Sequence, residues 1–296
     1  MKRLTFFTIS TIAAFLIGCS SESSTSNSWL NKEVVTIKKG ELLEITPTNS
    51  NKVLASTLEV YNLDNTLNLI DSSFRLTNEE DKFYLNRALE LSVAKRVESR
   101  NCEVGKVTVD DHGNGVSEDI DVIFENCLVD DITFDGVIHY IRIEDALNLE
   151  ARVRGLKVTT NDKEAYYESA YIKLDNNNIY EELSGYMKEG QKSAYFKDLH
   201  LEIKSFDEKK VYRVDGSLAT SCIDNKWIDI NTTTAIEKNI TLNCPTKGVI
   251  EIDGNSSKIE AIYNSNESID IYLDGNLTKT FNSCEEMEEE VESSCN

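Results

Sequence analysis

The sequence predicts a mainly β protein: a duplicated antiparallel β-meander, built as a sandwich or a curved open sheet, with an N-terminal helical segment. Two observations predict this fold. After Cys102, apolar and polar residues alternate with a period of two, as in half-buried strands. Cys102 and Cys127 recur as Cys222 and Cys244, with offsets of 120 and 117 residues. Two prolines, thirteen glycines and 40% hydrophobic residues are untypical of a fibrous chain and leave enough apolar surface for a core.

The chain begins with a pattern typical of an export signal. Lys2 and Arg3 form a basic start, residues 4–17 are mostly apolar, and Gly18 directly precedes Cys19. This run is too short to act as a membrane-spanning anchor, so we expect residues 1–18 to be a signal peptide that is removed. Loss of the two basic residues takes the formal charge from −21 to −23. A charge of this sign repels nucleic acid, so we expect no nucleic-acid partner.

Leu16-Ile17-Gly18-Cys19 resembles the lipobox of bacterial lipoproteins, and the resemblance covers about the first twenty residues. It implies that the Cys19 thiol carries a diacylglycerol and that the new N-terminus is acylated, with fatty acids such as palmitate. Two or three chains, at about 0.8 kcal/mol per buried methylene, hold a protein firmly at a membrane. Ser20 follows the cysteine, where an aspartate would favour the inner membrane. The class therefore implies a lipid anchor in the outer membrane, facing the periplasm or the cell surface.

The rest of the chain divides into four expected parts. Residues 19–32 contain the lipidated cysteine and a flexible tether, because the tract 20–28 (SSESSTSNS) has little to bury. Residues 33–101 are expected to hold a first strand and a helical segment. Residues 102–221 and 222–296 are expected to be the first and second β repeats.

The part before Cys102 has weaker patterns than the β repeats. Residues 33–46 alternate loosely and predict a first strand, and the apolar residues of 52–69 fit helical spacing in part. A clearer helix begins at Thr77, with a glutamate three residues later as in a capping box, and continues to about Val97. We expect this helical segment to cover one face or edge of the sheet.

Four later segments alternate most clearly and predict short antiparallel strands: 119–125, 137–144, 199–203 and 269–273. Apolar-Asp-Gly motifs follow the second cysteine of each repeat, for example Phe134-Asp135-Gly136 and Ile252-Asp253-Gly254. Glycine accepts a positive φ in a hairpin turn or a bulge. These motifs are therefore interpreted as architectural rather than chemical.

The seven cysteines leave an even number once Cys19 is assigned to lipid. The six others are Cys102, Cys127, Cys222, Cys244, Cys284 and Cys295. Six cysteines in an exported protein predict a disulfide framework with fifteen possible connectivities. Spacing favours sequential neighbours, which are 102 with 127, 222 with 244, and 284 with 295. A structural zinc site is the weaker alternative, because no Cys-x-x-Cys occurs and the histidines are scattered.

The acidic stretch at 110–121 partly matches a calcium-binding loop, with Gly115 at the tight turn. The candidate ligands are Asp110, Asn114, the carbonyl of Val116, Glu118 and Asp121. His112 at the third position and Ser117 at the eighth depart from the pattern, and the final aspartate is shorter than the usual glutamate. An acidic hairpin turn is the alternative interpretation. The cofactor expectation is therefore none, or one structural Ca²⁺.

The C-terminal run from Glu285 to Glu292 predicts a short acidic helix capped by Asn282 or Ser283. No Gly-x-Ser-x-Gly, His-Glu-x-x-His or phosphate-binding glycine loop occurs, so no catalytic residues are assigned and we do not expect an enzyme. The sequence predicts a tethered, non-enzymatic binding or structural module. The alternatives are a carrier of a hydrophobic, lipid-like ligand and a periplasmic or surface hydrolase. The expected partners are the membrane, through the lipid, and envelope proteins or a small hydrophobic ligand.

Overall fold

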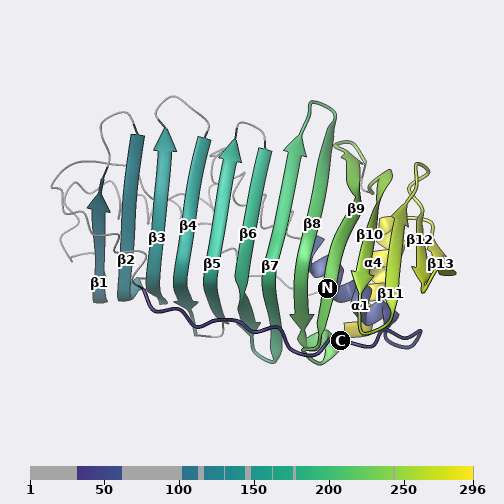
Figure 1. The fold of residues 1–296 in the computed structure, drawn as a ribbon, viewed down its shortest axis with the longest axis horizontal. Helices are drawn as coiled ribbons and strands as arrows, with labels where there is room; N and C mark the ends of the chain where they lie inside the picture. Colours follow the sequence, from purple (N-terminus) through teal and green to yellow (C-terminus); the bar gives the residue numbers. More distant parts are fainter. Residues whose placement is uncertain are drawn as a thin grey trace. The chain divides into compact units, whose positions relative to one another are not determined.

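The computed structural model describes residues 32–61, 102–112, 117–129, 131–143, 148–161, 163–175, 178–242 and 244–295. Thirteen strands in this part of the chain form one open antiparallel sheet, in which each strand pairs with its neighbours in sequence (Figure 1). The strands are β1 (Val104–Asp111), β2 (Ser117–Val129), β3 (Ile132–Ile143), β4 (Asn148–Thr159), β5 (Lys163–Asp175), β6 (Asn178–Glu189), β7 (Lys192–Ser205), β8 (Lys209–Thr220), β9 (Trp227–Asn239), β10 (Lys247–Asp253), β11 (Lys258–Tyr263), β12 (Ile269–Leu273) and β13 (Asn276–Phe281). The prediction of a mainly β, antiparallel fold is confirmed, as an open sheet rather than a sandwich.

The described helices lie before, between and after the strands in sequence. They are α1 (Ser50–Tyr61), α4 (Cys284–Glu292) and the short 3₁₀ turns η3 (Ser221–Ile223) and η4 (Ser293–Cys295). The acidic C-terminal helix is confirmed as α4, and Ser283 is its N-cap, since its Oγ accepts a hydrogen bond from the backbone N–H of Glu286. The helix predicted from Thr77 to Val97 lies outside the described residues. No helix among the described residues has the length and apolar character needed to cross a bilayer.

The chain forms two compact units. The N-terminal unit comprises Met1–Thr36, Asn62–Lys173 and Met187–Gly190. The C-terminal unit comprises Ile37–Tyr61, Leu174–Tyr186 and Gln191–Asn296. The expected first repeat contains β1 to β8, and the expected second repeat contains β9 to β13.

The core of the C-terminal unit lies on one face of its strands. In β10, β11 and β12 every second residue is buried, and the residues between them are half-buried. Helices α1 and α4 contact each other, and they contact β8 and β13 respectively. Figure 1 shows both helices beside β9–β12. Their apolar residues Val53, Leu54, Met287 and Val291 are buried, so this face is filled by protein side chains.

Two of the Asp-Gly motifs lie inside long strands, opposite bulges in the neighbouring strands β4 and β7. Gly136 and Gly216 have φ values of 144° and 140°, and a Cβ on either would lie within 2.6 Å of neighbouring backbone atoms. The aspartate before the second glycine, Asp215, accepts a hydrogen bond of 2.8 Å from the backbone N–H of Thr232. The motif therefore fixes strand pairing by glycine conformation and by a side-chain acceptor. Asp274-Gly275, in contrast, forms the turn between β12 and β13, with φ values of 50° and 79°.

The strand predicted at 33–46 is not formed. This segment is extended, and its only bridge to the described strands is a parallel one between Leu42 and Trp227. The N–H of Leu43 donates to the carbonyl of Trp227 over 2.8 Å. Leu43 and Ile45 are buried while Glu44 between them is exposed, which explains the loose alternation without a ladder of strand hydrogen bonds.

All six cysteines beyond Cys19 form disulfides, but two of the three expected pairings are wrong. Cys102–Cys127 is confirmed. The other bonds are Cys222–Cys295 and Cys244–Cys284, instead of 222 with 244 and 284 with 295. The reason is the position of α4: Cys284 begins this helix and Cys295 follows it, so both ends are linked to segments far away in the sequence. Spacing along the chain does not reveal such long-range packing.

Candidate functional site

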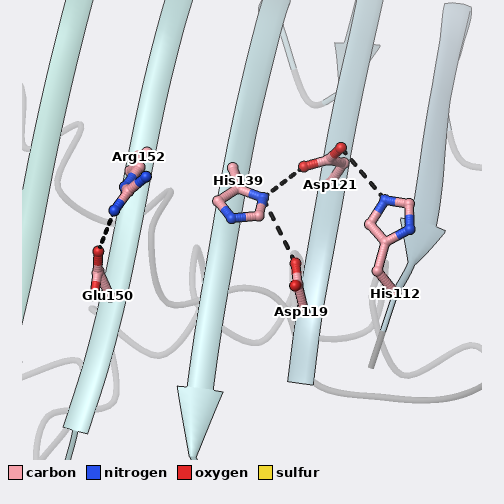
Figure 2. Close-up of polar contacts among 6 residues, drawn as sticks. All are labelled: His112, Asp119, Asp121, His139, Glu150 and Arg152. Carbon is pink, nitrogen blue, oxygen red and sulfur yellow. Dashed lines mark hydrogen bonds and ion pairs between the residues drawn. The ribbon is translucent and has the colours of Figure 1, made fainter. Parts of the chain in front are cut away.

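A row of polar side chains crosses the first four strands of the N-terminal unit (Figure 2). Strand register places Asp121 of β2 opposite His139 of β3, and His139 opposite Arg152 of β4. Because side chains opposite each other point to the same face, the three lie on one face of the sheet. Asp119 lies two residues before Asp121 and therefore shares this face.

Asp121 is the centre of this cluster and is only 1% exposed. Its Oδ1 accepts a hydrogen bond of 2.7 Å from Nδ1 of His139, which is also buried. Its Oδ2 lies 3.5 Å from Nε2 of His112, as Figure 2 shows. A buried carboxylate is costly unless it is paired and hydrogen-bonded, and these two histidines supply that pairing.

Other members of the row are paired less closely. Oδ1 of Asp119 lies 3.8 Å from Nδ1 of His139 and, although buried, accepts no hydrogen bond. Arg152 forms an ion pair of 2.8 Å with Glu150 and lies over the ring of Tyr171 at 5.7 Å. In the described part of the chain, no group of three or more His, Cys, Asp or Glu side chains is arranged to hold a metal ion. In the described residues the centre of the cluster is the hydrogen bond between Asp121 and His139, with His112 and Asp119 at ion-pair distances from them.

The candidate calcium ligands are only partly brought together. Asp110 of β1 lies opposite Asp121 of β2 in the strand register. Both carboxylate oxygens of Asp121 are directed at histidines instead of a shared centre. Glu118 lies on β2, whereas Asn114 and Val116 lie outside the described residues. A calcium ion at this loop stays a prediction, as does lipidation of Cys19, which also lies outside the described part.

Glu181 of β6 is a buried carboxyl that the sequence analysis did not single out. It is 6% exposed, and burial raises its pKa to about 7. Among the described residues, none forms a hydrogen bond or an ion pair with it. Its sequence neighbour Glu182 is half-buried, with its Oε2 3.8 Å from Nδ1 of His200. The sequence shows only that adjacent glutamates in a strand point to opposite faces; it does not show which of the two faces is buried.

The half-buried face of β9–β11 in the C-terminal unit carries like charges in direct opposition. Glu251 lies opposite Glu260, and Asp253 lies opposite Asp229. Burial first, and then the charges of Glu251 and Asp229, raise the pKa of Asp253. Like charges directly opposite each other are destabilising, so the acidic pairs on this face lower the stability of the fold.

Two lysines partly offset this charge. Lys258 forms an ion pair of 3.0 Å with Glu251, and Lys39 forms one of 2.6 Å with Asp229. Each of these pairs is partly solvent-exposed and therefore contributes little to stability. The face stays acidic, and it is suited to positively charged groups.

Comparison with protein-family models, with curated proteins and with solved structures finds no match. The function is therefore argued from the sequence and the geometry of this chain.

Proposed function

We propose that the protein is a lipid-anchored lipoprotein of the bacterial outer membrane that acts as a non-enzymatic binding or structural module. The observation that carries the proposal is the pairing of its cysteines. Six of the seven form three disulfides, and the seventh is Cys19 at the end of the lipobox-like sequence. Disulfides of this number are typical of an oxidising compartment outside the cytoplasm, which agrees with an export signal before Cys19.

The packing of the C-terminal unit supports a module that binds through its surface. Its apolar face is filled by α1 and α4, and Cys222–Cys295 and Cys244–Cys284 link α4 to the rest of the unit. The opposite face, over β9–β11, carries the acidic cross-strand pairs. A filled interior behind an acidic sheet face is the arrangement expected of a scaffold or a partner-binding domain.

Replacing Cys19 by Ser tests the anchor. We expect the exported wild-type protein to incorporate labelled palmitate and to sediment with outer membranes. The Cys19→Ser protein should incorporate none and stay in the soluble fraction. The matched variant Ser20→Asp keeps the lipidated cysteine and should move the protein to the inner membrane. Sedimentation of Cys19→Ser with membranes, or absence of label in the wild type, would refute the anchor.

A carrier of a hydrophobic ligand is the second candidate, and Glu181 is the observation that favours it. A scaffold gains nothing from an unpaired carboxyl among buried apolar side chains, whereas a carrier can use such a group to orient a ligand. Native mass spectrometry of the gently purified protein separates the two. A retained mass of several hundred daltons, lost on denaturation, supports the carrier, and a bare polypeptide mass supports the scaffold.

A further inference from the structure

We propose that the open edge of β13 binds an extended, basic polypeptide segment of another protein, which pairs with β13 as an added strand. This inference rests on the proposed function of a module that binds through its surface. It adds the class of partner and the mode of recognition. Main-chain hydrogen bonds to β13 would supply the pairing, and lysine or arginine side chains of the segment would meet carboxylates beside this edge.

The strand β13 is the last strand of the sheet and lies at the end of the row of strands in Figure 1. Among the described strands it pairs only with β12, so one of its two edges has no strand partner. Its residues Asn276, Leu277, Thr278 and Thr280 are exposed. An edge strand directs part of its N–H and C=O groups away from its neighbour, so this edge can accept a further strand.

The usual protection of an edge strand by charged residues is weaker in β13 than in β1, the strand at the other end of the sheet. Each of the two strands has one register shift, so a bulge does not distinguish them. β1 contains three charged residues, which are Lys106, Asp110 and Asp111. β13 contains one, Lys279, which lies over the ring of Phe281 at 4.5 Å and forms an ion pair with Glu290 of α4. This lysine is already engaged within the C-terminal unit, so β13 is the less protected edge.

The charge beside β13 selects a basic partner. On the half-buried face of the sheet, Oγ1 of Thr280 donates a hydrogen bond of 2.6 Å to Oδ1 of Asp270, which places this carboxylate next to β13. Helix α4 follows β13 and contacts it, and residues 276–290 contain five glutamates and one lysine. A basic segment complements this charge, whereas a second copy of this acidic chain is repelled by it.

Leu277 gives the edge an apolar contact. Strand register places it opposite Tyr272 of β12, and it is 56% exposed. Cross-strand neighbours on one face contact each other, so an apolar side chain of the added strand is expected beside Leu277. The segment that fits this edge therefore combines basic and apolar residues, as an alternating β-strand does.

The experiment uses the full Cys19→Ser protein and the fluorescent peptide (Lys-Val)4, with both ends blocked. Fluorescence anisotropy in low salt should show saturable binding. The peptide (Lys-Pro)4 has the same charge but lacks every second N–H and cannot pair as a strand, so it should bind at least about tenfold more weakly. Equal binding of the two peptides would show that charge alone attracts them and would overturn strand addition. Absence of binding by (Lys-Val)4 would also overturn the proposal.

Two matched variants test the position of the peptide. Leu277→Lys places a like charge at the edge and should weaken the binding of (Lys-Val)4 at least about tenfold. Ile240→Lys is the control, because Ile240 is also aliphatic and exposed (58%) but lies directly after β9. It adds the same charge and should leave the affinity within about twofold. Equal loss in both variants, or no loss in Leu277→Lys, would overturn the assignment to β13.

Two further measurements need no binding variant. Hydrogen exchange of the Cys19→Ser protein should slow in β13 when (Lys-Val)4 is added and should be unchanged in β1. Protection of β1 instead of β13 would place the peptide at the other edge and overturn the assignment. Sedimentation velocity without peptide should show a monomer, and a dimer that Leu277→Lys dissociates would assign this edge to a second copy and overturn the basic partner. Palmitate labelling tests the anchor whether or not the peptide binds, so the two proposals can fail separately.

Discussion

Asp121 in the N-terminal unit and Glu181 in the C-terminal unit are both buried carboxyls, but their surroundings differ. Asp121 receives a hydrogen bond of 2.7 Å from His139 and faces His112. Glu181 lies on an apolar face, and burial raises its pKa to about 7. The comparison teaches that equal burial gives opposite outcomes: the paired carboxyl strengthens strand pairing, whereas the unpaired one weakens the fold once it ionises.

Removing the paired carboxyl should have the largest effect. Asp121→Ala leaves His139 buried without its acceptor, and breaking a buried pair by removing one partner costs about 3–5 kcal/mol of unfolding free energy. Urea denaturation followed by circular dichroism measures this loss. Asp119→Ala, which removes the half-exposed neighbour, should cost less than about 1 kcal/mol. If both substitutions cost the same, the 2.7 Å contact is not what stabilises this region.

Neutralising the unpaired carboxyl of Glu181 should raise the unfolding free energy instead of lowering it, and the size of this effect should depend on pH. The pKa of Glu181 in the folded state, about 7, lies above the ordinary value of 4.5, so its contribution is fully present below pH 4.5. It is lost as the pH rises towards and through 7, by a total of about 3 kcal/mol. We therefore compare the unfolding free energy of Glu181→Gln with that of the wild type at each pH. The difference should be about 3 kcal/mol more favourable to the variant at pH 8 than at pH 4.

Denaturation of both proteins at the two pH values measures this difference, because the other titrating groups cancel. Glu182→Gln, which changes the adjacent half-buried glutamate on the opposite face of the strand, is the matched control. A Glu181→Gln protein that parallels the wild type at every pH would show that Glu181 has a partner.

A buried hydroxyl on β6, the strand that contains Glu181, gives a neutral group to compare with the two buried carboxyls. Ser184 of β6 is 2% exposed, and its Oγ accepts a hydrogen bond of 2.9 Å from the backbone N–H of Asp198. Ser184→Ala removes a partnered neutral group, so it should cost about 1–2 kcal/mol, less than Asp121→Ala. Thermal unfolding of the two variants side by side gives the ranking. If Ser184→Ala costs as much unfolding free energy as Asp121→Ala, the charge of the Asp121 pair does not explain the effect of removing it.

The smallest effect is expected on the acidic face of β9–β11. Glu260→Gln removes the like charge opposite Glu251 and should raise the unfolding free energy by about 0.5 kcal/mol in low salt. The gain should vanish in 1 M NaCl, where the Debye length is about 3 Å. Denaturant titrations at the two salt concentrations check both statements, and a gain that persists in high salt would point to packing instead of charge.

Many elements of the fold follow from local sequence patterns and could be predicted from the sequence. Alternation identifies the strands, and Ser283 followed three residues later by Glu286 identifies the start of α4. Strand register is not local, which is why the Asp121–His139 pair was missed. A stretch as acidic as 110–121 is typical of a solvated turn, and only the pairing of β2 with β3 places His139 opposite Asp121.

The wrong disulfide assignment has the same physical origin. Cys102 lies just before β1, and Cys127 lies near the end of β2 that pairs with the start of β1, so the two cysteines meet. Cys244 and Cys284 meet only because α4 packs against the C-terminal unit, and sequence spacing contains no information on that packing. Glu181 likewise differs from the exposed glutamates by its burial in the folded protein, and sequence spacing does not show which glutamates are buried.

The nested order of the C-terminal disulfides affects how the chain must mature. In the export that we propose, Cys222 and Cys244 emerge well before Cys284 and Cys295. An oxidase that acts as residues appear would then first join two cysteines that are not partners in the native state. Reaching Cys222–Cys295 and Cys244–Cys284 then requires thiol–disulfide exchange, which is slow without a catalyst. The C-terminal unit is therefore expected to depend on a disulfide isomerase, whereas Cys102–Cys127 can form from an oxidase alone.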